Sequence, residues 1–215
     1  MKTYHIGLDF GTYQSKACVY DVDKNEHEFF RFPSNQSFFL PSRVAEKNDG
    51  CFEYGNDKTR LPRKEYHYFK IAAAEDDEFI SETYGNSSIT SSFYKFNEYN
   101  DCSPEFLSVI YLTYLLFTIK ESYQSQNNKK VPGTGLIGRL LSRQNEENSS
   151  KFTIQMGIPT EWSQEKNLFR KRKFENILLL AEVLQKKYKN LAYFLHVPKS
   201  QLIKDIKEIY ESKFL

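Results

Sequence analysis

Residues Tyr4–Asp23 read YHIGLDFGTYQSKACVYDVD, two strand-like runs on either side of a short polar turn. In the first run, apolar side chains alternate with smaller or polar ones, and a period of two residues is typical of a strand with one buried face. The apolar positions are Tyr4, Ile6, Leu8 and Phe10. The run Lys16–Val22 is also strand-like, and the connection between the two runs begins with Gly11. The stretch therefore predicts a β-hairpin.

The hairpin is expected to continue as an antiparallel meander. The run HEFFRF, His27–Phe32, follows the turn DVDKNE and predicts a third strand. From residue 34 to residue 102, short runs are interrupted by Asn, Ser, Asp and Gly, and their periodicity is weak. We therefore expect a small inserted subdomain at residues 34–102, and a core subdomain formed by residues 1–33 and 103–215.

The rest of the chain predicts helices that alternate with strands. Ser103, Pro104 and Glu105 form a typical helix start, with a capping hydroxyl, a proline in the first turn and an acid near the positive end of the helix dipole. This helix is apolar nearly all round as far as about Tyr123, so it should be covered on more than one side. Further elements are expected as a strand at Lys151–Pro159, a helix from Ser163 to about Lys187, a strand at residues 190–197 and a helix at Lys199–Ser212.

The resulting order, βββαβαβα, predicts the fold class. Strands that are separated by long helices usually pair in parallel, whereas strands joined by short turns are antiparallel. We therefore expect an α/β fold with a five-stranded mixed sheet and a small inserted subdomain.

Composition limits the classes of function. The formal net charge is only +2, which argues against nucleic acid or an anionic membrane as the default partner. The apolar run Phe106–Ile119 is shorter than the roughly 20 residues of a membrane span, so it predicts a buried helix and no membrane partner. A strand-like pattern begins almost at the first residue and leaves no room for a signal peptide. The three cysteines are widely spaced and odd in number, which favours a reducing compartment and a cytoplasmic location.

A charged residue, Asp9, ends the first run two positions before the glycine of the turn. A tight turn that contains a small residue lets several backbone N–H groups converge on one anion, as in a phosphate-binding nest. Gly11 would permit close approach of the backbone, and Thr12 would add a hydroxyl. Tyr13 and Gln14 would offer mainly their backbone amides. The alternative is an ordinary turn in which Asp9 caps its own loop.

The segment IGLDFGTYQSKACVYD resembles the first phosphate-binding hairpin of the DnaK-type (heat-shock 70 kDa) chaperones and, more distantly, that of the actin and sugar-kinase superfamily. Four later segments are similar to segments of the same chaperones and follow in the same order. They are LPSRVAEKNDGCFEYGND, YFKIAAAEDD, CSPEFLSVIYLTYLL and FTIQMGIPTEW. The resemblance implies that the chain is the N-terminal lobe of an actin-like, ribonuclease-H-like ATPase domain.

The resemblance also implies roles for single residues. Asp9 would order the waters of a bound Mg²⁺, and Lys70 would stabilise charge on the transferred phosphate, which makes these two the candidate catalytic residues. The alternative for Lys70 is a surface lysine. Protein clients and co-chaperones are the further partners that the family implies. The phosphates of ATP or ADP would be bound by Gly11, Thr12, Tyr13 and Gln14.

The chain departs from the family in several places. Val197 stands where the family has a glutamate that helps to coordinate the metal waters, and the second phosphate loop and the adenosine-binding loop are absent from the sequence. A nucleotide in this fold lies between two lobes, so this chain would supply half of the site. ATP hydrolysis is therefore expected only in a longer, two-lobe protein. The non-enzyme alternative is a degenerate lobe that acts as a protein-interaction module, and the enzyme alternatives are a sugar kinase or an actin-like filament protein.

Three other motifs carry weaker signals. GTGLIG, residues 133–138, matches a dinucleotide-binding pattern but follows a polar segment rather than a strand, so we expect a loop insertion. The basic run FRKRKFE would place Lys166, Arg170 and Lys173 on one side of a helix, where phosphate or RNA could bind, but the near-neutral net charge favours a solvated helix face. The aromatic residues in 93–99 are expected to pack locally.

Overall fold

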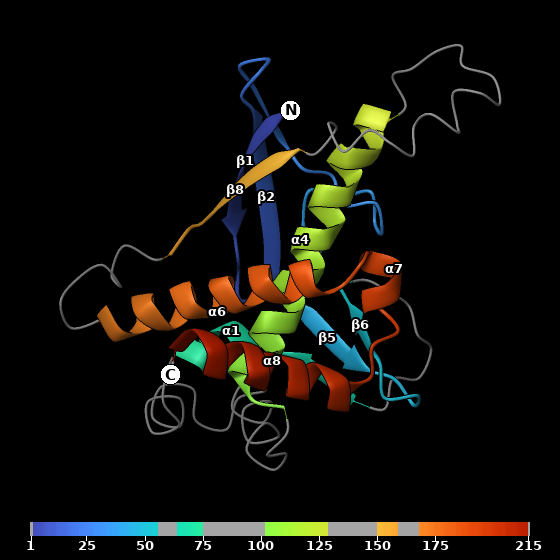
Figure 1. Cartoon of the computed structure of the whole chain (residues 1–215), viewed down its shortest axis with the longest axis vertical. Coiled ribbons are helices and arrows are strands. Elements are labelled where there is room, and N and C mark those ends of the chain that lie inside the picture. Colours follow the sequence, from blue (N-terminus) through green and yellow to red (C-terminus); the bar gives the residue numbers. More distant parts are fainter. Residues whose placement is uncertain (1, 56–63, 75–101, 129–149, 159–167, 215) are drawn as a thin grey trace.

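The structure is a computed structural model and describes residues 2–55, 64–74, 102–128, 150–158 and 168–214. Within these ranges the chain forms an α/β fold, with a five-stranded mixed sheet, a separate three-stranded sheet and several helices (Figure 1). The predicted α/β class and the predicted mixed sheet are thereby confirmed.

The main sheet is built on the hairpin. Its strands are β1 (Thr3–Asp9), β2 (Gln14–Asp21), β3 (Glu26–Phe29), β4 (Leu40–Pro41) and β8 (Lys151–Met156). The order is β3-β2-β1-β8, and β4 pairs with the start of β2. Strands β1, β2 and β3 are antiparallel, with Ile6 opposite Val19, whereas β1 and β8 are parallel, with Ile6 opposite Ile154. Both kinds of pairing agree with the sequence prediction.

Residues 190–197 do not form the strand that their aromatic and β-branched side chains predict. They contain the short helix α7 (Leu191–Phe194), whose first turn is capped by Asn190: its side chain accepts a hydrogen bond of 2.8 Å from a backbone N–H of that turn. Phe194 is buried and stacks against the ring of Tyr54, so tertiary packing overrides local propensity here. The prediction of this strand was wrong, and the fifth strand of the main sheet is β4.

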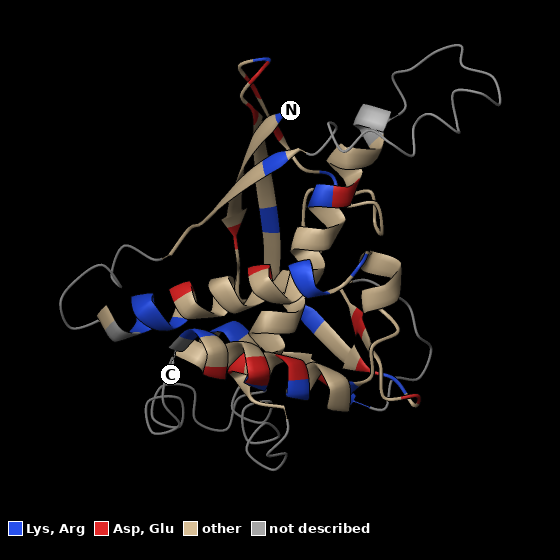
Figure 2. Ribbon diagram, in the orientation of Figure 1, with Lys and Arg blue, Asp and Glu red and all other residues tan. Residues whose placement is uncertain are grey.

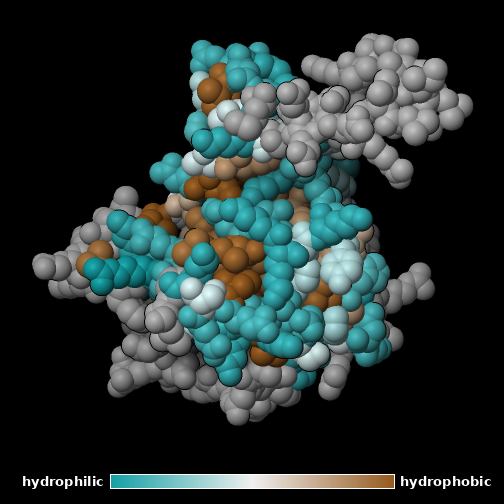
Figure 3. Space-filling model, in the orientation of Figure 1, coloured by the Kyte–Doolittle hydropathy of each residue, from teal (hydrophilic) through white to brown (hydrophobic). Residues whose placement is uncertain are grey.

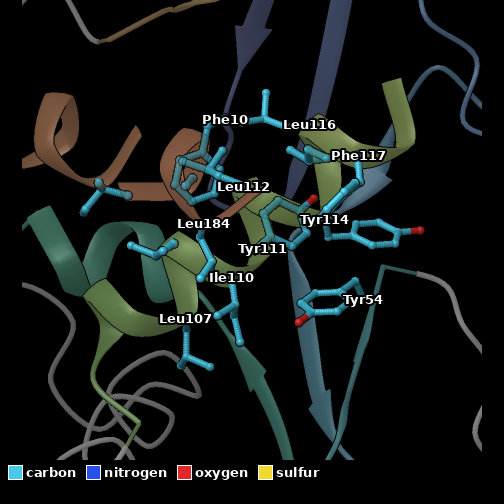
Figure 4. Close-up of a cluster of buried hydrophobic side chains, with 14 of the residues drawn as sticks. Phe10, Tyr54, Leu107, Ile110, Tyr111, Leu112, Tyr114, Leu116, Phe117 and Leu184 are labelled. Carbon is cyan, nitrogen blue, oxygen red and sulfur yellow. The ribbon is translucent and has the colours of Figure 1, made fainter. Parts of the chain in front are cut away.

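Helix α4 (Pro104–Asn128) forms the centre of the hydrophobic core. The Ser103 hydroxyl accepts a hydrogen bond of 3.1 Å from the backbone N–H three residues on, which is the expected N-terminal cap. Every residue of 106–120 is buried, as the uniformly apolar composition predicts. Figure 4 shows side chains of α4 that reach Phe10 in the hairpin loop and, in another direction, Tyr54 of the second sheet.

Two further helices, α6 (Leu168–Lys187) and α8 (Lys199–Phe214), pack against each other and against α4 (Figure 1). Helices were predicted at both places, and the structure confirms them. The expected cap of α6, Ser163, lies outside the described residues. Within the described ranges, no helix combines the length and the apolar character that crossing a membrane requires.

The region predicted as an irregular insert contains a regular sheet. Its strands are β5 (Arg43–Glu46), β6 (Phe52–Tyr54) and β7 (Lys64–His67), in the antiparallel order β6-β5-β7, and helix α1 (Phe69–Ala74) follows. Strands of three or four residues are too short to show a period in the sequence. One continuous hydrophobic core includes side chains from both sheets. The subdomain limits at residues 34 and 102 stay a prediction.

Candidate functional site

The turn of the hairpin, residues 10–13, follows the carboxyl end of β1. Strand β8 ends at the same edge, where the backbone N–H of Gly157 donates a hydrogen bond of 2.8 Å to the carbonyl oxygen of Leu8. Because β1 and β8 are parallel, their carboxyl ends meet at one edge of the main sheet (Figure 1). Ligands of open α/β sheets commonly bind outside such ends, so this edge is the natural place for a site.

Gly11 sets the shape of the turn. A Cβ atom at this position would lie 2.0 Å from the backbone carbonyl oxygen of Gln14, so a residue with a side chain does not fit this backbone. Ser42, which follows β4, holds the turn through two hydrogen bonds. Its hydroxyl donates to the carbonyl oxygen of Gly11 at 2.7 Å, and its backbone N–H donates to the carbonyl oxygen of Tyr13 at 2.8 Å. The carbonyl groups of Gly11 and Tyr13 are therefore both engaged by Ser42.

The backbone N–H groups of the same turn are placed differently. Among the residues that the structure describes, no acceptor is found for the N–H of Gly11, Thr12 or Tyr13. Successive N–H groups without a protein acceptor are the arrangement from which anion-binding nests are built. None of residues 10–13 has a positive φ, so the convergence of these N–H groups on one anion and the binding of phosphate both stay predictions.

Lys70, on helix α1, lies beside the hairpin. Its ammonium nitrogen is 5.6 Å from the centre of the Phe10 ring. Burial lowers the pKa of Lys70, and the negative charge of Asp9 acts in the opposite direction. The structure therefore brings two residues that are far apart in the sequence, Asp9 and Lys70, close enough for their charges to interact.

Asp9 also pairs with Lys16 on the neighbouring strand, with 3.2 Å between the carboxylate oxygen Oδ2 and the ammonium nitrogen. The side chains of Asp9 and Lys16 are 57% and 45% exposed, so this ion pair is weak and either partner can turn toward a ligand. Within the described residues, no three His, Cys, Asp or Glu side chains gather in a way that could hold a metal ion. The described part of the chain therefore has no cluster of side chains that could ligate a metal ion by itself. The exposed carboxylate of Asp9 is suited to contact the waters of a metal ion.

The other predicted residues of the turn lie at or near the surface. Tyr13 and Gln14 are exposed and Thr12 is partly buried. Gln14 is the first residue of β2 and lies opposite Pro41. The backbone N–H groups of the turn are therefore its candidate binding groups.

Three buried hydroxyl groups support the turn, and sequence reasoning missed them as site residues. The hydroxyls of Ser15 and Ser42 are 3.0 Å apart, and the Tyr111 hydroxyl donates a hydrogen bond of 3.1 Å to the carbonyl oxygen of Pro41. Burial raises the pKa of Tyr111, so its hydroxyl stays protonated and remains a donor. Ser15 and Ser42 stand inside the matched segments of the sequence, but only the tertiary structure shows that they touch.

Val197 lies between α7 and α8 and not at the end of a strand, and its alignment with the family's glutamate stays a prediction. Val197 is buried between α7 and α8, close to the point where the backbone N–H of Lys199 donates a hydrogen bond of 2.8 Å to the carbonyl oxygen of Gly50. Gly50 belongs to the connection between β5 and β6. The segment therefore packs by the second sheet and adds no strand to the edge of the main sheet.

The basic run on α6 is partly engaged within the protein. The Arg170 side chain donates a hydrogen bond of 3.0 Å to the carbonyl oxygen of Ala74, and the Lys173 ammonium lies 2.9 Å from a carboxylate oxygen of Glu105. Figure 2 shows Lys and Arg in the first turns of α6, whereas both signs of charge occur along α8. Arg170 and Lys173 thus have local roles that need no nucleic acid. Three predicted features lie outside the described residues, namely Lys166, GTGLIG at 133–138 and the aromatic residues in 93–99.

A groove of about 580 Å³ lies between α4, α6 and α8. Apolar side chains line most of it, and charged side chains stand at its rim. Figure 3 shows hydrophobic surface at the centre of the face on which α6 and α8 lie. Apolar grooves are a common form of protein contact site, although Phe106, Val109, Ile177 and Leu180 in this lining are themselves buried. The lining includes Phe106, Val109, Ile177, Leu180, Ile203 and Ile206.

No protein-family model matches the chain, and no curated protein matches it in sequence.

Proposed function

We propose that this chain is the N-terminal lobe of a DnaK-like ATPase of the actin type, and that its hairpin turn binds the phosphates of Mg·ATP or Mg·ADP. The observation that carries the proposal is the turn itself. Its carbonyl groups at Gly11 and Tyr13 are held by Ser42, while no acceptor is found in the described residues for three successive N–H groups. This turn lies at the carboxyl edge of the main sheet, beside the Lys70 ammonium.

The groups at this edge match the chemistry of a phosphate. Backbone N–H groups donate hydrogen bonds to phosphate oxygens, and each such bond to a charged group contributes about 1.5–3 kcal/mol. Two or three of them, together with the Lys70 ammonium, would hold a diphosphate. Lys16 adds a second positive charge close to Asp9, which keeps the edge favourable for an anion although a carboxylate is present.

The residues also fit Mg²⁺ that is held mainly by phosphate. Mg²⁺ keeps several waters in its shell and is commonly bound through one or two carboxylates together with phosphate oxygens. Asp9 supplies one exposed carboxylate next to the turn, which suits contact through water. Bound Mg²⁺ would neutralise phosphate charge, and the turn amides and Lys70 would orient the phosphate chain.

Binding is proposed for this chain, whereas hydrolysis is proposed only for a longer protein with a second lobe. The segment that was expected to supply the family's glutamate carries Val197 and does not form a strand. In a two-lobe protein, nucleotide between the lobes would change their relative orientation and so alter the affinity for protein clients or co-chaperones. The antiparallel hairpin followed by a parallel strand, β8, supports the actin-type lobe.

Nuclear magnetic resonance of the ¹⁵N-labelled chain tests the proposal. Titration with Mg·ADP or Mg·ATP should shift the amide signals of Gly11, Thr12 and Tyr13 in a saturable way, because phosphate would bind to these N–H groups. Adenosine with Mg²⁺ is the control, since it lacks phosphate and should leave the three signals in place. Signals that do not move at millimolar nucleotide would refute the phosphate site.

A protein-interaction module is the second candidate, and the apolar groove between α4, α6 and α8 favours it. In that case the hairpin would be a structural turn, and Asp9→Ala would leave the function intact. The same titration separates the candidates, because an interaction module has no reason to respond to nucleotide at residues 11–13.

A further inference from the structure

The backbone of Tyr68 is in the left-handed region, with a φ of 59°. Among the described residues, two other non-glycine residues have a positive φ, Asn25 and Gln36, and both lie in surface turns. Asn takes up this conformation readily, whereas a bulky aromatic residue does so rarely and at a cost in stability. Tyr68 lies in the one-residue connection between β7 and α1, so the chain reverses direction at a strained position beside the candidate phosphate site.

The side chains of Tyr68, Phe69 and Lys70 all lie against the hairpin. The Tyr68 ring meets the Tyr13 ring edge to face, with the ring centres 5.1 Å apart and an angle of 84° between the rings. Phe69 is fully buried, with its ring centre 6.1 Å from that of Phe10. The Lys70 ammonium lies over the same Phe10 ring. Successive side chains at the start of α1 therefore contact the hairpin at Phe10 and Tyr13.

We propose that Tyr68 is a positioning residue of the phosphate site: its ring clamps Tyr13 and so fixes the turn amides and the Lys70 ammonium on the same anion. This inference rests on the proposed function of the turn. Tyr13 is 62% exposed in the turn of the hairpin, and its ring is in contact with a second aromatic ring. The Tyr68 ring provides that contact, and the carbonyl oxygen of Tyr68 also accepts a hydrogen bond of 3.1 Å from the N–H of Ala72 in the first turn of α1.

Glycine at position 68 separates the ring from the backbone. Glycine adopts a positive φ without strain, so Tyr68→Gly keeps the backbone conformation. It removes the contact with Tyr13 together with the packing of the ring against the core and against His67. Tyr68→Phe keeps the ring and removes the hydroxyl. Tyr13→Ala removes the other ring and leaves position 68 unchanged, which guards against a folding defect in the first variant. Tyr193→Ala is the matched control. Tyr193 lies on α7, is 61% exposed, and has its ring in contact with that of another tyrosine, Tyr188.

The experiment is the titration of each full-length variant with Mg·ADP, followed through the amide signals of residues 11–13, with urea unfolding measured in parallel. Loss of one well-placed hydrogen bond to a charged group corresponds to about a tenfold loss of affinity. We expect Tyr68→Gly and Tyr13→Ala to bind Mg·ADP at least about tenfold more weakly, and Tyr68→Phe and Tyr193→Ala to bind like the wild type.

The outcomes separate this inference from the proposed function. If the wild type binds and Tyr68→Gly binds equally well, the clamp is refuted while the phosphate site stands. If the wild type itself shows no shift at residues 11–13, the phosphate site fails and the inference falls with it. A lower unfolding midpoint for Tyr68→Gly with unchanged affinity would show that the ring pair serves the fold alone, which also overturns the inference.

Discussion

The hydroxyl of Ser42 donates a hydrogen bond of 2.7 Å to the carbonyl oxygen of Gly11. The Ser42 hydroxyl also lies 3.0 Å from the hydroxyl of Ser15, and both serine side chains are buried. The hairpin turn is thus held by a residue from beyond β4 as well as by its own strands. Buried polar groups are costly to leave without partners, so this contact should matter for the stability of the fold and for the shape of the turn.

Ser42→Ala should destabilise the protein by about 1–3 kcal/mol, because it removes the hydroxyl that donates to the Gly11 carbonyl and contacts the Ser15 hydroxyl. Urea unfolding, followed by circular dichroism, measures the change in the free energy of unfolding. A double-mutant cycle with Ser15→Ala isolates the contact between the two hydroxyls. Strict additivity of the two single effects would show that the hydroxyls do not interact.

Gly11→Ala should cost about 1–3 kcal/mol, because its Cβ would overlap the carbonyl oxygen of Gln14 and force the turn to open. Gly7→Ala, in the same hairpin, is the matched control. Its Cβ would meet its nearest neighbour, the Cys18 carbonyl oxygen, at an ordinary 3.8 Å, so it should be neutral or slightly stabilising. Equal unfolding free energies for the two variants would contradict the steric requirement at Gly11.

The turn should also lose phosphate affinity when Gly11 is replaced. An opened turn would displace the N–H groups that are proposed to bind phosphate, so Gly11→Ala should abolish the Mg·ADP-dependent shifts at residues 12 and 13, whereas Gly7→Ala should keep them. Measuring both variants well below their unfolding temperatures separates lost binding from lost folding. Normal nucleotide binding by Gly11→Ala would argue against the nest.

The pKa of Lys70 should lie below that of an ordinary lysine, because burial disfavours its charged form. Asp9 acts against this shift, so Asp9→Asn should lower the pKa of Lys70 further. The titration of the Lys70 side chain, followed through its ¹³Cε signal, measures both values. Glu65→Gln, on β7, is a control that should leave the signal unchanged. A rise in the pKa of Lys70 in Asp9→Asn would show that the two charges do not interact as the structure indicates.

Asp205 connects the end of α6 to α8 and should make stability depend on pH. Burial by itself would raise the pKa of Asp205, but hydrogen bonds from Lys187, Tyr188 and Gln201 together outweigh burial and lower it below 3.8. A carboxyl group whose pKa is lower in the folded state stabilises the fold above its unfolded pKa, and this contribution is lost as the pH falls through the folded value. The stabilisation should therefore be complete at pH 7 and fade below about pH 4.

Asp205→Asn tests this contribution. At pH 7 it should destabilise the protein by about 1.5–3 kcal/mol, since hydrogen bonds to a buried charge are lost or weakened. The difference from the wild type should shrink as the pH is lowered from 5 to 3 in urea-unfolding experiments. Glu211→Gln, an exposed residue on the same helix, should have almost no effect at either pH. A constant difference across this range would show that the charge of Asp205 is not the cause.

Elements whose pattern is local could be predicted from the sequence. Strand β1 alternates apolar with smaller or polar residues, and α4 is so uniformly apolar that burial on every side follows directly. The parallel pairing of β1 and β8 follows from the helix between them.

The conformation of residues 190–197 could not be predicted. Their composition favours a strand, whereas their contacts in the folded protein stabilise a short helix. The Asn190 cap and the stacking of Phe194 on Tyr54 stabilise a helical turn, and the packing partner is supplied by a strand far away in the sequence. The second sheet was missed for a related reason. Its three- and four-residue strands are too short to carry a period, so pairing with one another decides their conformation.

The sequence by itself determined the hairpin, the buried helix α4 and the glycine turn that follows Asp9, since each depends on residues that are neighbours along the chain. Only the tertiary structure decided what surrounds the turn. Ser42 reaches it from beyond β4, and Lys70 reaches it from the start of α1. The left-handed backbone of Tyr68 sets the direction in which α1 begins. Such contacts depend on the packing of distant segments into one core, which no local pattern of side chains records.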